Sequence, residues 1–161
     1  FEMGFGTGLN AALAWQYSEN YGIAINYYGI EKFPISDKLA SEIDINDLKL
    51  NKKLKSLHSL NWNGSHSFNQ FSFKKEQLDL KDFNLENSFD IIFYDAFAPN
   101  AQPELWTDEI FQKMYASLKE GGILSTYCAK GEVKRCMKRS GFRIESPPGP
   151  VGKREMTIAY K

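Results

Sequence analysis

Hydrophobic and polar residues follow one another along this chain in blocks whose spacing changes between helix-like and strand-like. Apolar residues at helical spacing in an alanine-rich segment predict a helix over residues 8–19. A continuous apolar run over residues 23–30 is typical of a buried strand, and it ends at Glu31. A polar region with regularly placed leucines, roughly 36–60, predicts further helix, and a weaker strand pattern covers about 68–74.

The second half contains the clearest strand pattern, residues 89–94, which ends at Asp95. After a loop with two prolines, Thr107 and the two acidic residues that follow it predict the start of a helix reaching about Lys119. Gly121-Gly122 is expected to end that helix. The remaining predicted elements are a strand over 123–128, a basic helix over 130–140 stopped at Gly141, and two strands over about 142–146 and 154–160.

Strand and helix alternate until the last two elements, which are both strands. This order predicts an α/β protein with a doubly wound, mostly parallel sheet and an antiparallel C-terminal edge strand. We find no repeats and no linker, so we expect one domain over residues 1–161. Only Phe1, Glu2 and Met3 precede a glycine-rich turn that a full strand normally precedes. We therefore expect that a natural N-terminal segment is missing.

The overall amino-acid composition indicates little about function, but the distribution of charged residues along the chain is uneven. The chain has 161 residues, of which 42% are hydrophobic and 25% charged, as in ordinary globular proteins, and 20 basic residues balance 20 acidic ones. Residues 127–161, however, carry nine Lys or Arg against three Glu. Such a local excess favours a surface that faces a polyanion, although a solvated helix face gives the same pattern.

The cysteines and the absence of long apolar stretches indicate the cellular compartment of the protein. Cys128 and Cys136 are too few for a disulfide framework and wrongly spaced for a zinc site, so we expect reduced thiols and no metal. No apolar stretch approaches the length of a membrane span, and no basic-then-apolar leader is present. We therefore expect a cytoplasmic protein with no membrane partner.

The segment from Glu2 to Asn10, Glu-Met-Gly-Phe-Gly-Thr-Gly-Leu-Asn, is the first candidate for chemistry. Alternate glycines before a helix let the backbone approach a ligand closely, and the helix N-terminus favours an anionic group. A dinucleotide-binding turn requires a glycine where Leu9 stands, so the spacing disfavours a dehydrogenase. It suits S-adenosylmethionine better, with Glu2 taking the amino group. A tight turn without any ligand is the alternative.

Two acids at strand ends are the next candidates. Glu31 closes the second strand, and in open α/β sheets ligands lie outside the carboxyl ends of the strands, so it can accept both ribose hydroxyls. Asp95 closes the strong strand and is expected to face the space above a reacting methyl group. The alternatives are a solvated Glu31 and an Asp95 that caps the following loop.

The remaining unusual side chains have structural interpretations. We expect His58 and His66 to be surface histidines, and Trp62 to contribute packing with the phenylalanines near it. Trp106 is either a platform for stacking on a base or a buried anchor of its loop.

Several short motifs occur together in one order. They are Glu2 to Asn10, Glu31-Lys32-Phe33-Pro34, Asp95-Ala96-Phe97-Ala98-Pro99, Glu104-Leu105-Trp106-Thr107, Gly121 to Tyr127, Gly141-Phe142 and Gly152-Lys153-Arg154-Glu155-Met156. Over essentially the whole chain this set resembles the tRNA 5-methylaminomethyl-2-thiouridine methyltransferases, that is, the methyltransferase half of the bifunctional enzyme MnmC and its stand-alone relatives.

The resemblance implies methyl transfer from S-adenosylmethionine to the exocyclic amine of 5-aminomethyl-2-thiouridine at the tRNA wobble position. It implies tRNA as a partner, a separate or fused FAD-dependent oxidase, and no flavin on this chain. The implied catalytic residue is Asp95. The implied cofactor-binding residues are Glu2, Gly4, Phe5, Gly6, Gly8, Leu9, Asn10, Glu31, Lys32 and Asp95. The implied substrate-binding residues are Phe97, Lys153 and Arg154, with Lys134, Arg135, Lys138 and Arg139 as further candidates for phosphate contact.

The chain departs from the family at the third strand, where Gly-Asp normally lies near the adenine. Phe73-Lys74-Lys75-Glu76 stands in that region, so either Glu76 or the backbone alone is expected to hold the adenine. Two other functions remain open. One is a methyltransferase acting on a small-molecule or protein amine, and the other is a non-catalytic nucleotide-binding module.

Overall fold

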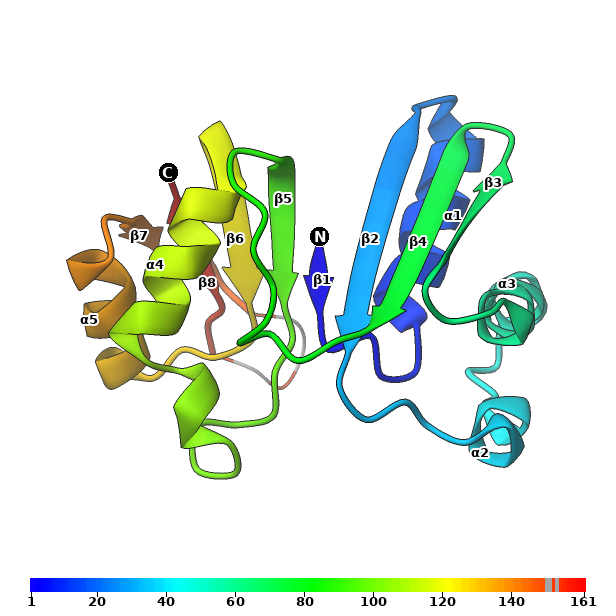
Figure 1. The fold of residues 1–161 in the computed structure, drawn as a ribbon, viewed down its shortest axis with the longest axis horizontal. Helices are drawn as coiled ribbons and strands as arrows, with labels where there is room; N and C mark the ends of the chain where they lie inside the picture. Colours follow the sequence, from blue (N-terminus) through cyan, green and yellow to red (C-terminus); the bar gives the residue numbers. More distant parts are fainter. Residues whose placement is uncertain (150–151, 153) are drawn as a thin grey trace. The chain divides into compact units, whose positions relative to one another are not determined.

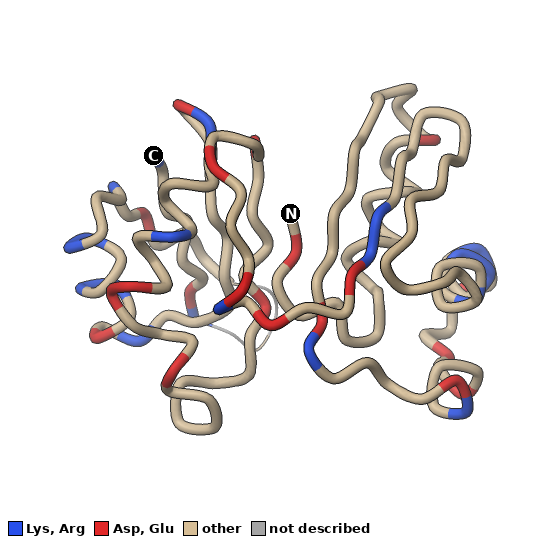
Figure 2. The backbone as a smooth tube through the Cα atoms, in the orientation of Figure 1, with Lys and Arg blue, Asp and Glu red and all other residues tan. Residues whose placement is uncertain are grey.

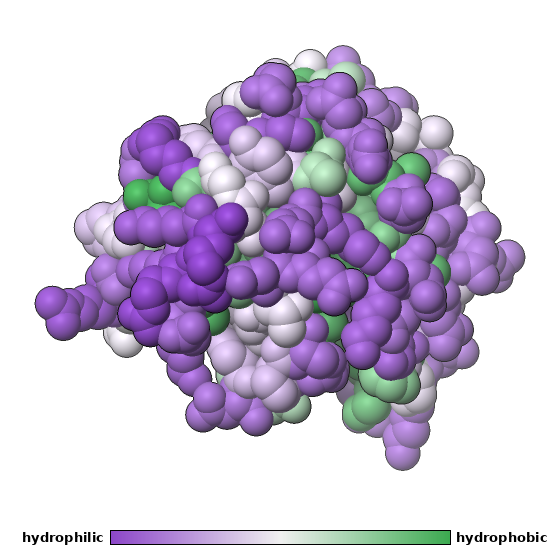
Figure 3. Space-filling model, turned by 60° about the vertical axis from the view of Figure 1, so that its left-hand side comes forward, coloured by the Kyte–Doolittle hydropathy of each residue, from purple (hydrophilic) through white to green (hydrophobic). Residues whose placement is uncertain are grey.

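The computed structural model describes residues 1–149, 152 and 154–161. The chain forms two compact units, one of Glu2–Asp79 and one of Phe1 with Leu80–Lys161 (Figure 1). No helix in the described part of the chain is long and apolar enough to cross a bilayer. In the space-filling view, hydrophilic side chains dominate the surface and hydrophobic ones are scattered among them (Figure 3).

The unit Glu2–Asp79 has strands in the order β3-β4-β2-β1. Strand β2 is parallel to both β1 and β4, whereas β3 is antiparallel to β4. The elements are β1 (Glu2–Met3), α1 (Leu9–Tyr21), β2 (Ile25–Glu31), α2 (Asp37–Glu42), α3 (Leu48–Ser59), β3 (Gly64–Phe68) and β4 (Phe71–Gln77).

The local chemistry of this unit explains where its helices begin and end. Helix α1 ends at Gly22, whose positive φ of 65° turns the chain so that the N–H of Ile23 donates to the carbonyl oxygen of Ser18 at 3.2 Å. Helix α3 begins after Asp47, whose carboxylate accepts hydrogen bonds from the N–H groups of Lys49 and Leu50. Three leucines at helical spacing on α3 are buried, and three of its four lysines are exposed. The buried residues are Leu50, Leu54 and Leu57.

The second unit has strands in the order β5-β6-β8-β7. Strands β5 and β6 are parallel, and the C-terminal strand β8 lies antiparallel between β6 and β7. The elements are β5 (Phe89–Tyr94), the 3-10 turn η1 (Pro103–Leu105), α4 (Asp108–Ser117), β6 (Leu118–Thr126), α5 (Gly131–Arg139), β7 (Arg143–Glu145) and β8 (Thr157–Tyr160). The α/β class and the antiparallel C-terminal strand are as the sequence predicts.

The structure differs from the sequence prediction in three places. The region 36–60 is two helices, because the chain between them turns through Asn46, which has a φ of 56°. A short strand β3 precedes the predicted strand at β4 and forms a hairpin with it. Gly121-Gly122 lies within β6 rather than at the end of a helix, because α4 already ends at Ser117 and Leu118 is extended.

Candidate cofactor-binding site

The glycine-rich loop between β1 and α1 has a conformation that only glycine adopts easily. Gly4, Gly6 and Gly8 have φ values of 87°, 49° and 76°. The N–H groups of Gly4 and Phe5 both donate to the carbonyl oxygen of Ile30, each at 3.1 Å, which fixes the loop against β2. A Cβ on Gly8 would lie 2.7 Å from the buried ring of Phe5. Gly8 therefore has no room for a side chain, whereas Gly6 is required for its positive φ alone, since the nearest atom to an added Cβ there is 3.8 Å away.

Glu31 binds this loop directly. Its Oε2 accepts from the N–H of Gly6 at 3.1 Å, and its Oε1 accepts from the N–H of Phe33 at 2.9 Å. The structure thus brings together the acid and the glycine turn, which lie 25 residues apart in sequence. Each carboxylate oxygen has a second lone pair, so Glu31 can still accept from hydroxyl groups of a ligand.

Glu2 is a buried carboxylate at the base of the same loop. It is 1% exposed, and its Oε1 accepts from Nδ2 of Asn10 at 2.8 Å, which links the end of β1 to the first turn of α1. The arrangement places a carboxyl group at the base of the loop, which is the kind of partner that an ammonium group would require.

Lys32 and Leu9 are also assigned to the cofactor from the family resemblance. Lys32 forms an ion pair with Asp79, with Nζ 2.7 Å from Oδ2, and its Nζ lies 5.2 Å from the centre of the Phe33 ring. Leu9 is partly exposed at the start of α1.

His58 is a site residue that sequence reasoning missed. Expected to be a surface histidine, it is half-buried, and its Nε2 lies 2.9 Å from the carbonyl oxygen of Thr7 in the glycine-rich loop. Because a carbonyl oxygen only accepts, Nε2 carries the hydrogen. Burial lowers the pKa of His58, and the Thr7 hydrogen bond opposes that effect. The C-terminal turn of α3 is therefore attached to the loop.

Lys75 supports this attachment from inside the protein. It is 0% exposed on β4, and its Nζ donates to the carbonyl oxygens of Leu57 at 2.9 Å and His58 at 3.2 Å. Its Nζ lies 4.6 Å from the centre of the Trp62 ring. Burial lowers the pKa of Lys75 from 10.5 to about 8, and the charge of Asp37 opposes the shift. The lysine satisfies carbonyls at the end of α3 that the helix itself leaves without donors.

Glu76 is engaged within its own sheet. Oε1 forms an ion pair with Lys74 at 2.7 Å, and Oε2 accepts from the hydroxyl of Tyr28. Hydrogen bonds from Lys74 and then Tyr28 lower the pKa of Glu76. Each oxygen of Glu76 keeps a second lone pair, as in Glu31, so Glu76 and the backbone both remain alternatives for holding the adenine.

The second unit holds Asp95 and Phe97 on an anchored loop after β5. The hydroxyl of Tyr127 donates to the carbonyl oxygen of Ala96 at 2.8 Å, and Nε1 of Trp106 donates to that of Phe97 at 2.9 Å. Trp106 is only 7% exposed, so it is the buried anchor and not a stacking platform. The side chains of Asp95 and Phe97 are exposed, Phe97 by 71%.

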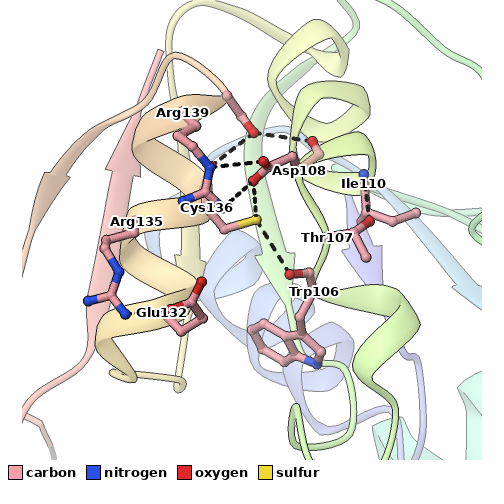
Figure 4. Close-up of polar contacts among 9 residues, drawn as sticks. Trp106, Thr107, Asp108, Ile110, Glu132, Arg135, Cys136 and Arg139 are labelled. Atoms are coloured by element: carbon pink, nitrogen blue, oxygen red, sulfur yellow. Dashed lines mark hydrogen bonds and ion pairs between the residues drawn. The ribbon is translucent and has the colours of Figure 1, made fainter.

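The basic residues of α5 are mostly paired with acids, and Figure 4 shows the contacts of Arg139 with Asp108. Arg139 forms two hydrogen bonds with Asp108, at 2.9 and 2.8 Å, and Arg135 pairs with Glu132. Lys134 pairs with Glu155 at 2.9 Å. These pairs weaken the interpretation of α5 as a free phosphate-binding face. Lys138 and Arg154 are both exposed. Lys153 lies outside the described residues.

Cys128 and Cys136 form no disulfide in the structure, and both are buried. The thiol of Cys136 donates to Asp108 at 2.7 Å (Figure 4), and burial raises its pKa to about 12. A thiol with this pKa is protonated and unreactive near neutral pH, so Cys136 has a structural role.

Comparison with known proteins places the chain in a family. A model of S-adenosyl-L-methionine-dependent methyltransferases matches residues 48–161. The bifunctional tRNA 5-methylaminomethyl-2-thiouridine biosynthesis protein MnmC of Pseudomonas fluorescens is 32% identical over 167 residues, covering 92% of this chain and 24% of that protein. The protein of the same name from Leptospira interrogans is 29% identical over 171 residues, covering 98% and 26%. The chain thus spans about a quarter of the length of these relatives.

A solved structure shows the same fold. The crystal structure of MNMC2 from Aquifex aeolicus has a TM-score of 0.79 and 24% identity to this chain, covering 98% of it and 51% of that protein. The resemblance seen in the motifs is therefore confirmed by overall sequence and by fold. The chain belongs to the S-adenosyl-L-methionine-dependent methyltransferase family.

Proposed function

We propose that this chain transfers a methyl group from S-adenosylmethionine to the exocyclic amine of 5-aminomethyl-2-thiouridine at the wobble position of tRNA. The observation that carries the proposal is the hydrogen bond between Glu31 and the N–H of Gly6. This bond holds Glu31, whose carboxylate can accept hydrogen bonds from the ribose hydroxyls of S-adenosylmethionine, beside the glycine-rich loop, which can bind the methionine part of the same molecule. The relatives named for this biosynthesis supply the choice of substrate.

The residues of the loop fit an adenosylmethionine molecule. A tight glycine loop, the buried carboxylate of Glu2 and the carboxylate of Glu31 offer a close backbone surface, a partner for an ammonium group and acceptors for ribose hydroxyls. We propose that the end of β4 holds the adenine, through Glu76 or through the backbone beside it. The sulfonium supplies the activated methyl group when it is bound.

The protein's remaining task is to position the amine. Methyl transfer is an in-line displacement in which the S–CH₃ bond breaks, an N–CH₃ bond forms and the amine then loses a proton to solvent. The attacking amine must be neutral, and a nearby cation disfavours its ammonium form. Asp95 accepts an N–H hydrogen bond, directs the lone pair to the methyl group and offsets the charge that develops on nitrogen.

The proposal also includes the tRNA contacts, the single domain and the partner oxidase that are expected from the sequence. Phe97, Lys153 and Arg154 contact the tRNA, the chain acts as one domain, and an FAD-dependent oxidase, fused or separate, shares the modification pathway. The relatives are themselves described as bifunctional, and this chain spans about a quarter of each.

The direct experiment incubates the protein with labelled S-adenosylmethionine and tRNA that carries 5-aminomethyl-2-thiouridine, followed by nucleoside analysis. We expect label in 5-methylaminomethyl-2-thiouridine, and none with tRNA already methylated at that amine. Label transferred only to small-molecule or protein amines would favour the rival methyltransferase. Cofactor binding without transfer to any amine would favour a non-catalytic module.

A further inference from the structure

Helix α3 is the most strongly basic element in the unit Glu2–Asp79. Over its 12 residues it carries Lys49, Lys52, Lys53 and Lys55 and no Asp or Glu. Figure 2 shows this concentration of basic positions along the helix. The excess escapes notice in the overall composition because acidic residues elsewhere in the chain balance it.

Three of the four lysines lie away from the buried leucines of α3, whereas Lys53 packs over the ring of Trp15, with its Nζ 4.1 Å from the ring centre. Lys49, Lys52 and Lys55 are all exposed. Neighbours three or four residues apart on a helix face each other, and like charges there cost about 0.2–0.5 kcal/mol per pair. Lys49 with Lys52 and Lys52 with Lys55 are such pairs, so the arrangement opposes helix stability. A binding role would account for a feature that local stability does not favour.

The acids that surround α3 leave three of its lysines available. Glu19 of α1 pairs with Lys53 at 2.7 Å. Asp44 is held by the N–H of Asn46 and by Asn51, which lower its pKa more than the charge of Lys55 does. Asp47 caps the helix. Across the described ranges, no ion pair joins Lys49, Lys52 or Lys55 to an acid.

The basic face is also continuous with the candidate site. Lys55 lies one turn before His58, whose imidazole is bonded to Thr7 of the glycine-rich loop. A polyanion bound along α3 therefore reaches the loop at the helix C-terminus. By contrast, three of the four basic residues of α5 are paired with acids.

We propose that Lys49, Lys52 and Lys55 form a binding surface for the phosphate backbone of RNA, which we call the α3 lysine face. This inference rests on the proposed function, since it names a surface that holds the same tRNA substrate. The contact is electrostatic and independent of sequence, so its signature is the dependence of binding on salt.

The test measures tRNA affinity of the full chain at several salt concentrations. For the triple variant Lys49→Gln, Lys52→Gln and Lys55→Gln we expect the slope of log affinity against log salt to flatten by about 2–3, because each lost contact removes about 0.7–0.9. Affinity at moderate salt should fall at least about tenfold. Glutamine preserves helix propensity, and an unchanged affinity for S-adenosylmethionine verifies that the site is intact.

Two single variants on the same helix control for the change in net charge, because each removes one positive charge. Lys52→Gln takes away an available charge, whereas Lys53→Gln takes away one that Glu19 already pairs. We expect Lys52→Gln to flatten the slope and Lys53→Gln to change it little. Equal effects of the two, or a triple variant with the wild-type slope, would overturn the inference.

The outcomes also separate this inference from the proposed function. If wild-type protein methylates tRNA but the triple variant keeps the full salt slope, only the α3 lysine face is wrong. If the wild-type protein neither binds nor methylates tRNA, the proposed function fails and the inference fails with it.

Discussion

The imidazole Nε2 of His58 lies 2.9 Å from the carbonyl oxygen of Thr7, which ties the end of α3 to the turn of the glycine-rich loop. The ring of Phe5 in that loop packs against the same imidazole, with centroids 5.4 Å apart. The loop is therefore held from two sides, by Glu31 at Gly6 and by His58 at Thr7.

Removing this bond should loosen the loop. We expect His58→Ala to weaken S-adenosylmethionine binding up to about tenfold, since a net hydrogen bond contributes about 0.5–1.5 kcal/mol. His58→Gln retains an N–H donor and should recover part of the loss. Calorimetric titration measures both. His66→Ala, which removes the other half-buried imidazole, is the control, and a loss as large as that of His58→Ala would contradict the specific role of the bond to Thr7.

Lys75 should make stability depend on pH above neutrality. Its pKa is about 8 in the folded protein and near 10.5 when unfolded, so the unfolded chain binds more protons between these values. Lys75 therefore contributes a rise in the free energy of unfolding with pH across that window, by up to about 3 kcal/mol. The raised pKa of the Cys136 thiol contributes a smaller fall, because the unfolded chain loses that proton first, so the difference between wild type and Lys75→Met isolates the lysine. Denaturant unfolding between pH 8 and 9.5 measures the rise before the tyrosines titrate.

Lys75→Met tests the source of that dependence. We expect this variant to lose most of the rise, because it lacks the titrating group. Lys52→Met, which changes an exposed lysine, should retain it. An identical rise in all three proteins would show that another group is responsible.

Gly8 and Gly121 provide a matched pair for the glycine-rich loop. Both have a positive φ, 76° and 75°, so alanine at either position costs about 1–2 kcal/mol of stability. Only at Gly8 would the new Cβ meet the Phe5 ring, at 2.7 Å, whereas at Gly121 nothing lies within 4 Å. We expect Gly8→Ala to abolish measurable cofactor binding and Gly121→Ala to leave it intact. Normal binding by Gly8→Ala would show that the loop tolerates displacement of Phe5.

Asp95 is proposed to orient the amine, so its replacement should affect turnover more than binding. We expect Asp95→Asn to lower kcat about ten- to a hundredfold with little change in S-adenosylmethionine affinity. Asp90→Asn, which alters an exposed acid on the same strand that pairs with Lys119, is the control. Steady-state kinetics with tRNA as substrate measure kcat for both variants. A wild-type kcat for Asp95→Asn would show that Asp95 has no role in the mechanism.

Local patterns predicted the fold well where one segment carries its own signal. Strand β5 is found at Phe89–Tyr94 as the apolar run predicts, and Thr107 caps α4, accepting from the N–H of Ile110. The turn between α2 and α3 was missed because it depends on Asn46 adopting a positive φ within a leucine-punctuated region.

Part of the candidate site was predictable because some of its segments carry a local signal. Glycine spacing and strand ends indicated the loop and Glu31, which the fold brings together. The roles of His58 and Lys75 depend on contacts between residues 51 and 18 positions apart, which no local pattern encodes. One signal was present, since Phe71, Phe73 and Lys75 alternate on the buried face of β4. A lysine at a buried strand position indicates a structural or functional partner.

The central claim is that the glycine-rich loop and Glu31 together bind S-adenosylmethionine. Isothermal titration of the wild-type protein and Glu31→Ala with S-adenosylmethionine tests it most directly. We expect saturable one-to-one binding by wild type and at least about tenfold weaker binding by Glu31→Ala, because charge-assisted hydrogen bonds contribute about 1.5–3 kcal/mol each. Equal affinity of the two proteins, or no heat of binding with wild type, would contradict it.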